Sequence, residues 1–237
     1  ALGLRSSTFL SPAQRVTSFS TWLNLTITRE VGRDWQHAFL RKGYQRGVAQ
    51  ADDDLQKAVK KTGQTFPRLE IASVFHQAIH AEEIALLESK YDRDLEGIQS
   101  VVVSQAARKV TEALSQQQAP EDVYTAVADR VDKVGNTRSK ALALTAIIDA
   151  FALGSLNRLA QVGIQRVSII PEVIFTTAND GRVCKLCQDF AGRSFDIFAA
   201  KGVIPLHGGC RCRWTLDLGF LLAQLGLIEV LTDDNKR

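Results

Sequence analysis

The sequence contains no methionine, only five prolines and no long apolar run. Because position 1 is alanine, we expect the numbered chain to begin after its initiator. A membrane-spanning helix needs about 20 predominantly apolar residues, whereas the most apolar run, 141–156, is shorter and contains Asp149. The first residues also lack the apolar segment of a signal peptide. These absences argue against the secreted and membrane classes, and they predict a soluble protein with no membrane partner.

A strong net charge is missing as well. The chain has 29 Lys and Arg residues and 26 Asp and Glu residues, which leaves a formal charge of +3. This charge is too small to indicate a nucleic-acid-binding protein by itself. Hydrophobic residues make up 45% of the sequence, which is enough for one sizeable core, or for a core and a small additional unit.

The first two thirds of the chain have the pattern of helices. Ser11 and Pro12 are typical of a helix start, and Gly163 is typical of a helix end. Between them, apolar residues recur at spacings of three and four on both sides of a loop that ends at Pro120. We therefore predict a mainly α protein, in which residues 1–168 form an elongated helical bundle.

Some residues of this part are expected to break helices or to face solvent. Gly43, Gly47 and the pair Gly135 and Asn136 are expected to interrupt helices, because glycine is a poor helix former. The following polar residues are interpreted as solvated helix faces and ends, and not as a site: Asp52, Asp53, Asp54, His76 and His80.

The pattern changes near residue 169. The segment 167–177 is rich in β-branched residues, and glycine and proline become frequent after it. A last apolar stretch, 218–231, is expected to form a short helix. We predict that residues 169–237 form a small α+β module that ends in this closing helix. The cysteines of this segment further predict that zinc stabilises the module.

All four cysteines of the chain lie in this module. Cys184 and Cys187 form a CxxC pair, and Cys210 and Cys212 form a CxC pair that follows His207. A tight turn lets both thiolates of a CxxC pair meet one ion, and a structural Zn²⁺ takes four Cys or His ligands. The spacing predicts a structural zinc site. Two disulfides or four unlinked thiols are the alternatives. A catalytic zinc is disfavoured, because three or four thiolates make the ion a poor Lewis acid.

The five candidate ligands are one more than a tetrahedral zinc needs. Cys184 and Cys187 are the first choice, and Cys210 is the next. In an extended CxC segment we expect the two cysteines to point to opposite faces, so that only one binds and His207 completes the set. In a tight turn both cysteines would bind and His207 would stay outside, so the fourth ligand is left open.

Basic residues surround the cysteines and outnumber the acidic ones. Such a patch could contact a phosphate backbone, and a solvated surface is the alternative. The residues predicted to contact nucleic acid are Arg182, Lys185, Arg193, Arg211 and Arg213.

The run TTANDGRVCKLCQDFAGRSFD, continued by IPLHGGCRC, resembles the C-terminal module of the phage Mu F-like head morphogenesis proteins, which are minor capsid proteins of tailed bacteriophages. That pattern has a strand ending in threonines, an aspartate and an arginine before CxxC, then a glycine and an aromatic residue, and a proline and histidine before CRC. Gly208 and Gly209 stand where the family has proline and asparagine. The matching residues are Thr176, Thr177, Asp180, Arg182, Cys184, Cys187, Gly192, Phe195, Pro205, His207, Cys210, Arg211 and Cys212.

The resemblance implies a minor head protein, present in several copies inside the virion capsid at the portal vertex and made in the host cytoplasm. It implies a role in head morphogenesis and in DNA packaging or ejection. The expected partners are the portal protein, other head proteins and packaged double-stranded DNA, bound without sequence specificity. The expected cofactor is a structural zinc ion, and no enzymatic activity is expected.

Two other functions compete with this one. Similar modules also occur beside toxin domains, so the chain could be an enzyme, such as an ADP-ribosyltransferase or a nuclease. It could also be a cytoplasmic, zinc-stabilised nucleic-acid-binding protein. The sequence shows no Ser/His/Asp order, phosphate-binding loop or paired-carboxylate motif, which favours the head protein over the enzyme.

Overall fold

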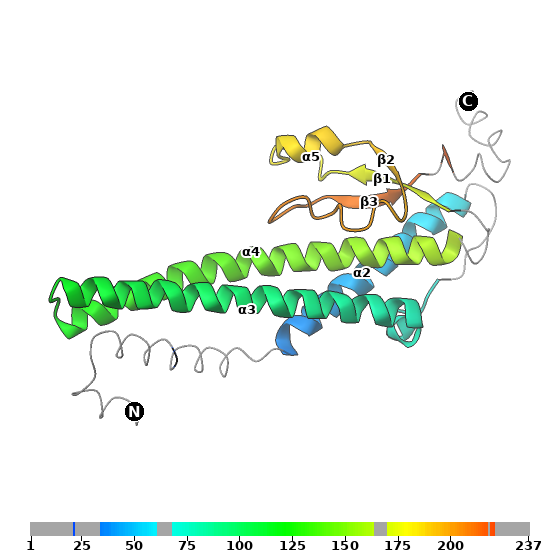
Figure 1. Ribbon diagram of the computed structural model, residues 1–237. Coiled ribbons are helices and arrows are strands. Elements are labelled where there is room, and N and C mark those ends of the chain that lie inside the picture. The colour runs from blue at the N-terminus through cyan, green and yellow to red at the C-terminus, as the bar shows by residue number, and fades with distance from the viewer. Residues whose placement is uncertain (1–20, 22–33, 61–67, 164–169, 218, 221–237) are drawn as a thin grey trace. The chain divides into compact units, whose positions relative to one another are not determined.

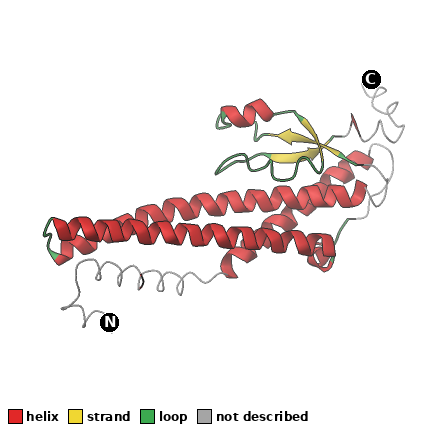
Figure 2. Ribbon diagram, viewed as in Figure 1, coloured by secondary structure: helices red, strands yellow, loops and turns green. Residues whose placement is uncertain are grey.

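The structure, a computed structural model, describes residues 21, 34–60, 68–163, 170–217 and 219–220. These residues are mostly helical, and a small antiparallel sheet lies near the C-terminal end of the chain (Figures 1 and 2). The prediction of a mainly α protein with a small α+β part is confirmed. The expected helix start at Ser11 and the expected closing helix at 218–231 lie outside the described residues, apart from 219–220.

In the described part of the chain, three long helices and one short 3-10 helix precede the sheet. Helix α2 spans Asp34–Lys60, the 3-10 helix η2 spans Ile71–His76, α3 spans Ala78–Ser115 and α4 spans Pro120–Val162. Gly135 and Asn136 lie inside α4, so the expectation that they break a helix was wrong. One glycine costs about 1 kcal/mol relative to alanine in a helix interior, which a helix of 43 residues can tolerate.

Helix α2 also runs unbroken through Gly43 and Gly47, because these glycines serve a close helix crossing. A β-carbon added at Gly47 would clash with the backbone of Phe151 in α4. A β-carbon added at Gly154 of α4 would lie 2.3 Å from the carbonyl oxygen of Tyr44 in α2. The two backbones approach so closely that a side chain fits on neither side, and the predicted interruption of α2 was wrong.

The chain forms two compact units. One comprises Ala1–Trp35 and Lys90–Leu142, and the other comprises Gln36–Ser89 and Ala143–Arg237. In the first unit, Arg130 of α4 donates two hydrogen bonds to the side-chain oxygen of Gln105 in α3, at 3.2 and 2.8 Å. The second unit contains most of α2, one end each of α3 and α4, and the sheet. The predicted division into a helical domain, 1–168, and a C-terminal module, 169–237, stays a prediction.

The sheet has three strands in the order β2-β1-β3, all antiparallel. Strand β1 is Glu172–Thr176, β2 is Ser194–Asp196 and β3 is Arg213–Leu216, and the short helix α5, Lys185–Phe190, lies between β1 and β2 in the chain. Burial alternates along β1, as expected for a strand with one face on the core.

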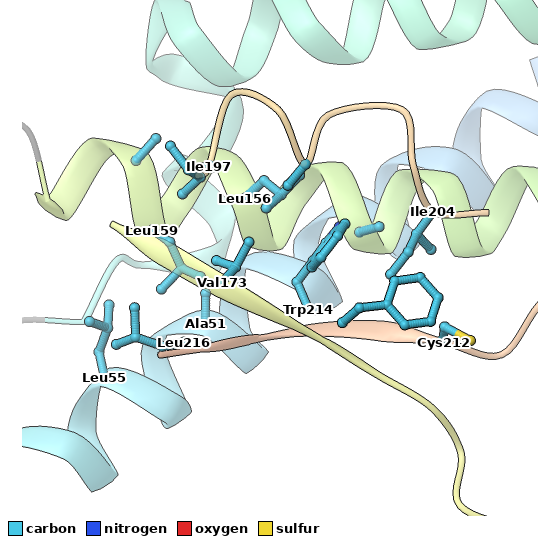
Figure 3. Packing of buried hydrophobic residues seen from close by; sticks show 14 of the residues in the cluster. Ala51, Leu55, Leu156, Leu159, Val173, Ile197, Ile204, Cys212, Trp214 and Leu216 are labelled. Carbon is cyan, nitrogen blue, oxygen red and sulfur yellow. The ribbon is translucent and has the colours of Figure 1, made fainter. Parts of the chain in front are cut away.

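The buried face of the sheet shares one core with the helices. Val173 and Trp214 of the sheet pack in the same cluster as Leu156 of α4 and Leu55 of α2 (Figure 3). Phe175 meets the Trp214 ring edge-on at a centroid distance of 5.6 Å, a favoured aromatic geometry. The cluster also includes three of the four cysteines, Cys187, Cys210 and Cys212.

Helix α4 is long and apolar enough, by length and composition alone, to cross a membrane. Core helices of water-soluble proteins pass the same test, and 39% of the apolar window is buried in the structure. A single helix of this kind is weak evidence for a membrane span. The absence of a membrane partner stays a prediction.

Candidate metal centre

The first cysteine pair is positioned by the start of α5. Cys184 is the N-cap residue of this helix, and its Sγ accepts a hydrogen bond from the backbone N–H of Cys187 at 3.4 Å. This capping contact brings the two side chains to the same end of the helix, as an N-cap acceptor does for the third residue after it. Cys184 is exposed and Cys187 is buried, so the pair spans the border between solvent and core.

The second arm turns sharply before it enters β3. Gly209 has a φ of +73°, a left-handed conformation that glycine adopts without strain. The turn is closed by the backbone N–H of Cys210, which donates to the carbonyl of His207 at 3.1 Å. The arm then passes through Cys212 and becomes strand only at Arg213. The glycine at position 209 therefore suits the backbone that this arm requires.

The imidazole of His207 is oriented toward the sulfur atoms. Its Nδ1 lies 2.9 Å from the carbonyl oxygen of Gly208. Because a carbonyl can only accept, this contact places the proton on Nδ1 and leaves a lone pair on Nε2. Nε2 lies 3.2 Å from the Sγ atoms of both Cys184 and Cys187. This is the arrangement in which a histidine commonly binds a metal, with its other nitrogen donating to an oxygen.

The donors form two groups that share Cys187. One group is Cys184, Cys187 and His207, the other is Cys187, Cys210 and Cys212, and within each group the ligand atoms lie within 4.8 Å of one another. A tetrahedral zinc with bonds of about 2.3 Å to sulfur and 2.0 Å to nitrogen separates two sulfurs by about 3.8 Å, and a sulfur from a nitrogen by about 3.5 Å. The Sγ atoms of Cys187 and Cys210 are 3.9 Å apart. The cluster can therefore hold a metal ion.

All five predicted ligands thus meet, and no other group of three or more Cys, His, Asp or Glu side chains gathers so closely in the part of the chain that the structure describes. The expectation that Cys210 and Cys212 point to opposite faces was wrong. Both are buried, and both belong to the group around Cys187. Residues two apart in an extended segment share a face, so the spacing of CxC directs both thiols to one side.

The surroundings oppose ionisation of two of the thiols. Burial raises the pKa of Cys187, and the neighbouring thiols of Cys212 and Cys184 raise it further. Burial also raises the pKa of Cys212, to about 11. At Cys184 the hydrogen bond from the backbone N–H of Cys187 lowers the pKa. A bound divalent cation deprotonates a coordinating thiol, so a metal ion would remove the penalty that burial imposes.

Asp180 links the two arms, and sequence reasoning did not assign it a role. Its carboxylate accepts from Nη1 and Nη2 of Arg211 at 2.6 and 2.7 Å, and from the backbone N–H of Arg182 at 3.0 Å. The Arg211 guanidinium, and next the Arg182 backbone, hold the pKa of Asp180 well below its usual range. The signal in the sequence was an aspartate before CxxC together with an arginine between the cysteines of CxC.

The five predicted nucleic-acid contacts have different surroundings. Arg182 and Arg211 meet at Asp180, so part of their charge is neutralised. The guanidinium of Arg193 lies 4.8 Å from the ring centroid of Phe190, within cation–π range. Lys185 and Arg213 are exposed, and neither forms an ion pair with another described residue. The five basic residues therefore differ in how much of their charge is free to contact a phosphate, which the sequence did not indicate.

A buried polar network in the helices was also missed. The Tyr44 hydroxyl lies 2.9 Å from Nδ1 of His80 and accepts from Nδ2 of Asn157 at 2.8 Å. Nearby, Asp52 accepts from Nε of Arg158 at 2.6 Å, and this ion pair is buried. His80 and Asp52 were interpreted as solvated residues, which was wrong. Each lies on a helix face that another helix covers, and spacing within one helix cannot show this.

Comparison of this chain with protein-family models, with curated proteins and with solved structures gives no match. The likeness to the Mu F-like module therefore rests on the motif residues alone.

Proposed function

We propose that this chain is a minor head protein of a tailed bacteriophage, and that one structural zinc ion holds its C-terminal module. In this role it associates with the portal inside the capsid and assists head morphogenesis and DNA packaging or ejection. Before assembly it resides in the host cytoplasm. The protein acts by binding and not by catalysis.

The observation that carries the proposal is the convergence of the motif residues. The two halves of the motif are far apart in the sequence, and the structure brings all five donors of both halves together. The three remaining charged motif residues also meet, because Asp180 forms ion pairs with both Arg182 and Arg211. Because the motif residues contact one another in the fold, their joint occurrence in the sequence has a structural explanation. This supports the resemblance.

Zinc suits this site better than other ions. The donors are thiols and an imidazole, without a carboxylate, and such sets bind zinc in closed tetrahedral sites. The four cysteines are free, and the 3.9 Å between the sulfurs of Cys187 and Cys210 is far longer than the roughly 2.05 Å of a disulfide bond. The ion would supply folding free energy to the module, and no open coordination position is needed for that role.

The metal is tested by elemental analysis of the purified chain, for which we expect about one zinc per chain. Cys187→Ser should abolish binding, because Cys187 belongs to both donor groups. Ser155→Ala is the control for a general loss of stability, since it removes a buried hydrogen bond between α4 and α2 and no candidate ligand. A preparation that contains neither metal nor free thiols would establish disulfides instead.

The contact with DNA is assigned to the basic residues that are not engaged by Asp180. Lys185 and Arg213 are exposed and have no ion pair among the described residues, so their charge is available to phosphates. Arg193 lies against Phe190 and keeps its charge. Contacts of this kind add a sequence-independent affinity that falls steeply with salt.

The function as a whole is tested by fractionating virions of the phage that encodes the chain. A minor band in purified heads, lost when the portal is absent, supports a portal-associated head protein. Absence from particles, together with activity on nucleotides or nucleic acid, would point to the toxin-like enzyme. Absence from particles together with nucleic-acid binding alone would point to the cytoplasmic nucleic-acid-binding protein.

A further inference from the structure

The ion pair between Asp180 and Arg211 has the geometry of a strong, directional contact. Both guanidinium Nη atoms donate to the carboxylate, one to each oxygen, at 2.6 and 2.7 Å. The backbone N–H of Arg182 donates a third hydrogen bond at 3.0 Å. Bidentate pairs of this kind fix orientation as well as distance. Isolated surface ion pairs contribute little to stability, so the interest of this one lies in what it joins.

The pair joins the two arms that carry the candidate ligands. Asp180 belongs to the turn that precedes Cys184, and Arg211 stands between Cys210 and Cys212. Among the described residues, it is the only polar side-chain link between residues 180–187 and 207–212 in which neither partner is a candidate ligand. The pair can therefore hold the arms together whether or not an ion is bound.

Cys210 and Cys212 are buried in the core, and Arg213 pairs with Thr176 of β1, but the glycine turn before them has few other restraints. A β-carbon at Gly209 would meet nothing within 4 Å, and one at Gly208 would meet only the Thr145 hydroxyl, at 3.7 Å. No side-chain packing at these glycines fixes the turn. Arg211 is the next residue but one after Gly209, and it is anchored from both guanidinium nitrogens. Its anchoring restricts the backbone on both sides, where Cys210 and Cys212 lie.

We propose that Asp180 is a positioning residue of the metal centre: by holding Arg211, it keeps the CxC arm beside the CxxC arm and slows the loss of the ion. This inference rests on the proposed metal centre. It assigns Asp180 no contact with the metal. The pair restricts the conformations of the second arm before the ion binds, so that binding costs less conformational entropy. When one donor releases the ion, the other donors stay in place and can hold it.

Charge alone would also speed the release of the ion when Asp180 is removed, so a control has to separate charge from position. A carboxylate near a cation site attracts the cation, but here it also neutralises Arg211, which stands between two candidate ligands. Asp180→Asn removes one negative charge and leaves Arg211 free to move. If only charge mattered, Asp180→Asn and Asp189→Asn would change the retention of the ion alike, since both remove one carboxylate near the CxxC pair. A positioning role makes Asp180→Asn alone release the ion faster.

The experiment uses the full chain loaded with Zn²⁺ or Co²⁺, and follows release into an excess of chelator by stopped flow. We expect Asp180→Asn to release the ion about 10-fold faster than wild type, at the lower end of the effects known for residues that orient metal ligands. Arg211→Gln should match it. The double variant should be no faster than either single variant, because both remove the same contact. Asp189→Asn is the matched control and should release at the wild-type rate.

The absorption spectrum of the Co²⁺ form separates positioning from ligation. The sulfur-to-cobalt charge-transfer and d–d bands of Asp180→Asn should keep the wild-type positions, since no ligand is lost. If Asp180→Asn does not fold, Arg211→Lys replaces it: this variant keeps the charge but not the two-point contact, and should release the ion about 3-fold faster.

Three results would overturn the inference. Release from Asp180→Asn or Arg211→Lys at the rate of Asp189→Asn would refute the positioning role and leave the metal centre intact. A shift of the Co²⁺ bands in Asp180→Asn would mean that Asp180 affects the ligand set itself. A wild-type chain that takes up neither Zn²⁺ nor Co²⁺ would refute the metal centre, and the positioning role with it.

Discussion

Gly47 of α2 lies so close to Phe151 of α4 that a β-carbon at position 47 would come within 2.0 Å of the Phe151 carbonyl oxygen. The contact is with backbone, so it cannot be relieved by turning a side chain. Close to this crossing, Ser155 of α4 donates a hydrogen bond to the carbonyl of Gly47 at 3.0 Å. The crossing of α2 and α4 is thereby fixed at a point where no other residue fits.

Gly47→Ala should therefore destabilise the protein by about 3 kcal/mol, at the upper end of the range for overpacking in a core. Gly97→Ala is the control, because a β-carbon there would meet nothing within 4 Å. It should stabilise α3 by up to about 1 kcal/mol through helix propensity. Urea unfolding followed by circular dichroism measures both. Equal midpoints for the two variants would contradict the close crossing.

The geometry of His207 predicts the fourth ligand. Because Nε2 lies 3.2 Å from the sulfurs of both Cys184 and Cys187, His207→Ala should reduce zinc affinity strongly. Cys212→Ser should reduce it less. The Co²⁺ forms check this directly, since three sulfur ligands give weaker charge-transfer absorption than four. Retention of the metal in His207→Ala and its loss in Cys212→Ser would instead establish a site of four cysteines.

The buried His80 predicts a loss of stability in acid. Burial lowers the pKa of His80, and the nearby charge of Arg158 acts in the same direction, while a contact with Gln161 and the charge of Asp52 oppose it. The Tyr44 hydroxyl bonds to Nδ1. Above the unfolded-state pKa of about 6.5, both states bind no proton, and the full stability is present. Below it, the unfolded state takes up the proton first, so stability falls as the pH drops toward the lower pKa of the folded state.

This effect has an upper bound of about 1.4 kcal/mol per pH unit, because one group titrates. Urea unfolding of wild type and His80→Gln between pH 8 and pH 5 measures it. The variant should be less stable at pH 8, but its stability should decline less steeply below pH 6.5. Parallel curves for the two proteins would show that other groups cause the acid sensitivity.

Charge reversal separates DNA binding from the Asp180 contact. Lys185→Glu with Arg213→Glu should weaken the binding of double-stranded DNA at low salt and reduce its salt dependence, since fewer counterions are released. The incorporation of this double variant into heads should be unchanged. Arg68→Glu is a control of the same chemistry, because Arg68 pairs with Asp53 outside the module. Undetectable wild-type DNA binding at low salt, with loss of incorporation on reversal, would make the patch a protein interface.

The sequence predicted the candidate metal centre well, because ligand spacing is a local property of the chain. Cys184 and Cys187 are close whenever a helix starts between them, and Gly209 allows the turn that brings His207 and Cys210 together. The choice among five donors could not be predicted, since it depends on how the two arms meet. The contact of Asp180 with Arg211 also depends on how the two arms pack together, so only the structure could show the roles of these two residues.

The helical part was predicted in type but not in packing. Apolar periodicity indicates helices whatever covers them, so the presence of α3 and α4 was predictable. Which polar residues become buried is decided by the neighbouring helix, and for this reason His80 and Asp52 were misinterpreted. Gly47 was misinterpreted for a related reason: propensity describes an isolated helix, whereas a crossing helix can make glycine the only residue that fits.

Cys187, Cys210 and Cys212 belong to the same apolar cluster as Leu156 of α4 and Leu55 of α2. Any ligand that binds only the folded state adds its binding free energy to the stability of that state. An ion bound by thiols of this cluster would therefore strengthen helices with which it has no contact. The zinc supply of the cell would then set how long newly made chains keep α2 and α4 together, and a chain starved of zinc would be exposed to proteases in its helices as well as in its sheet.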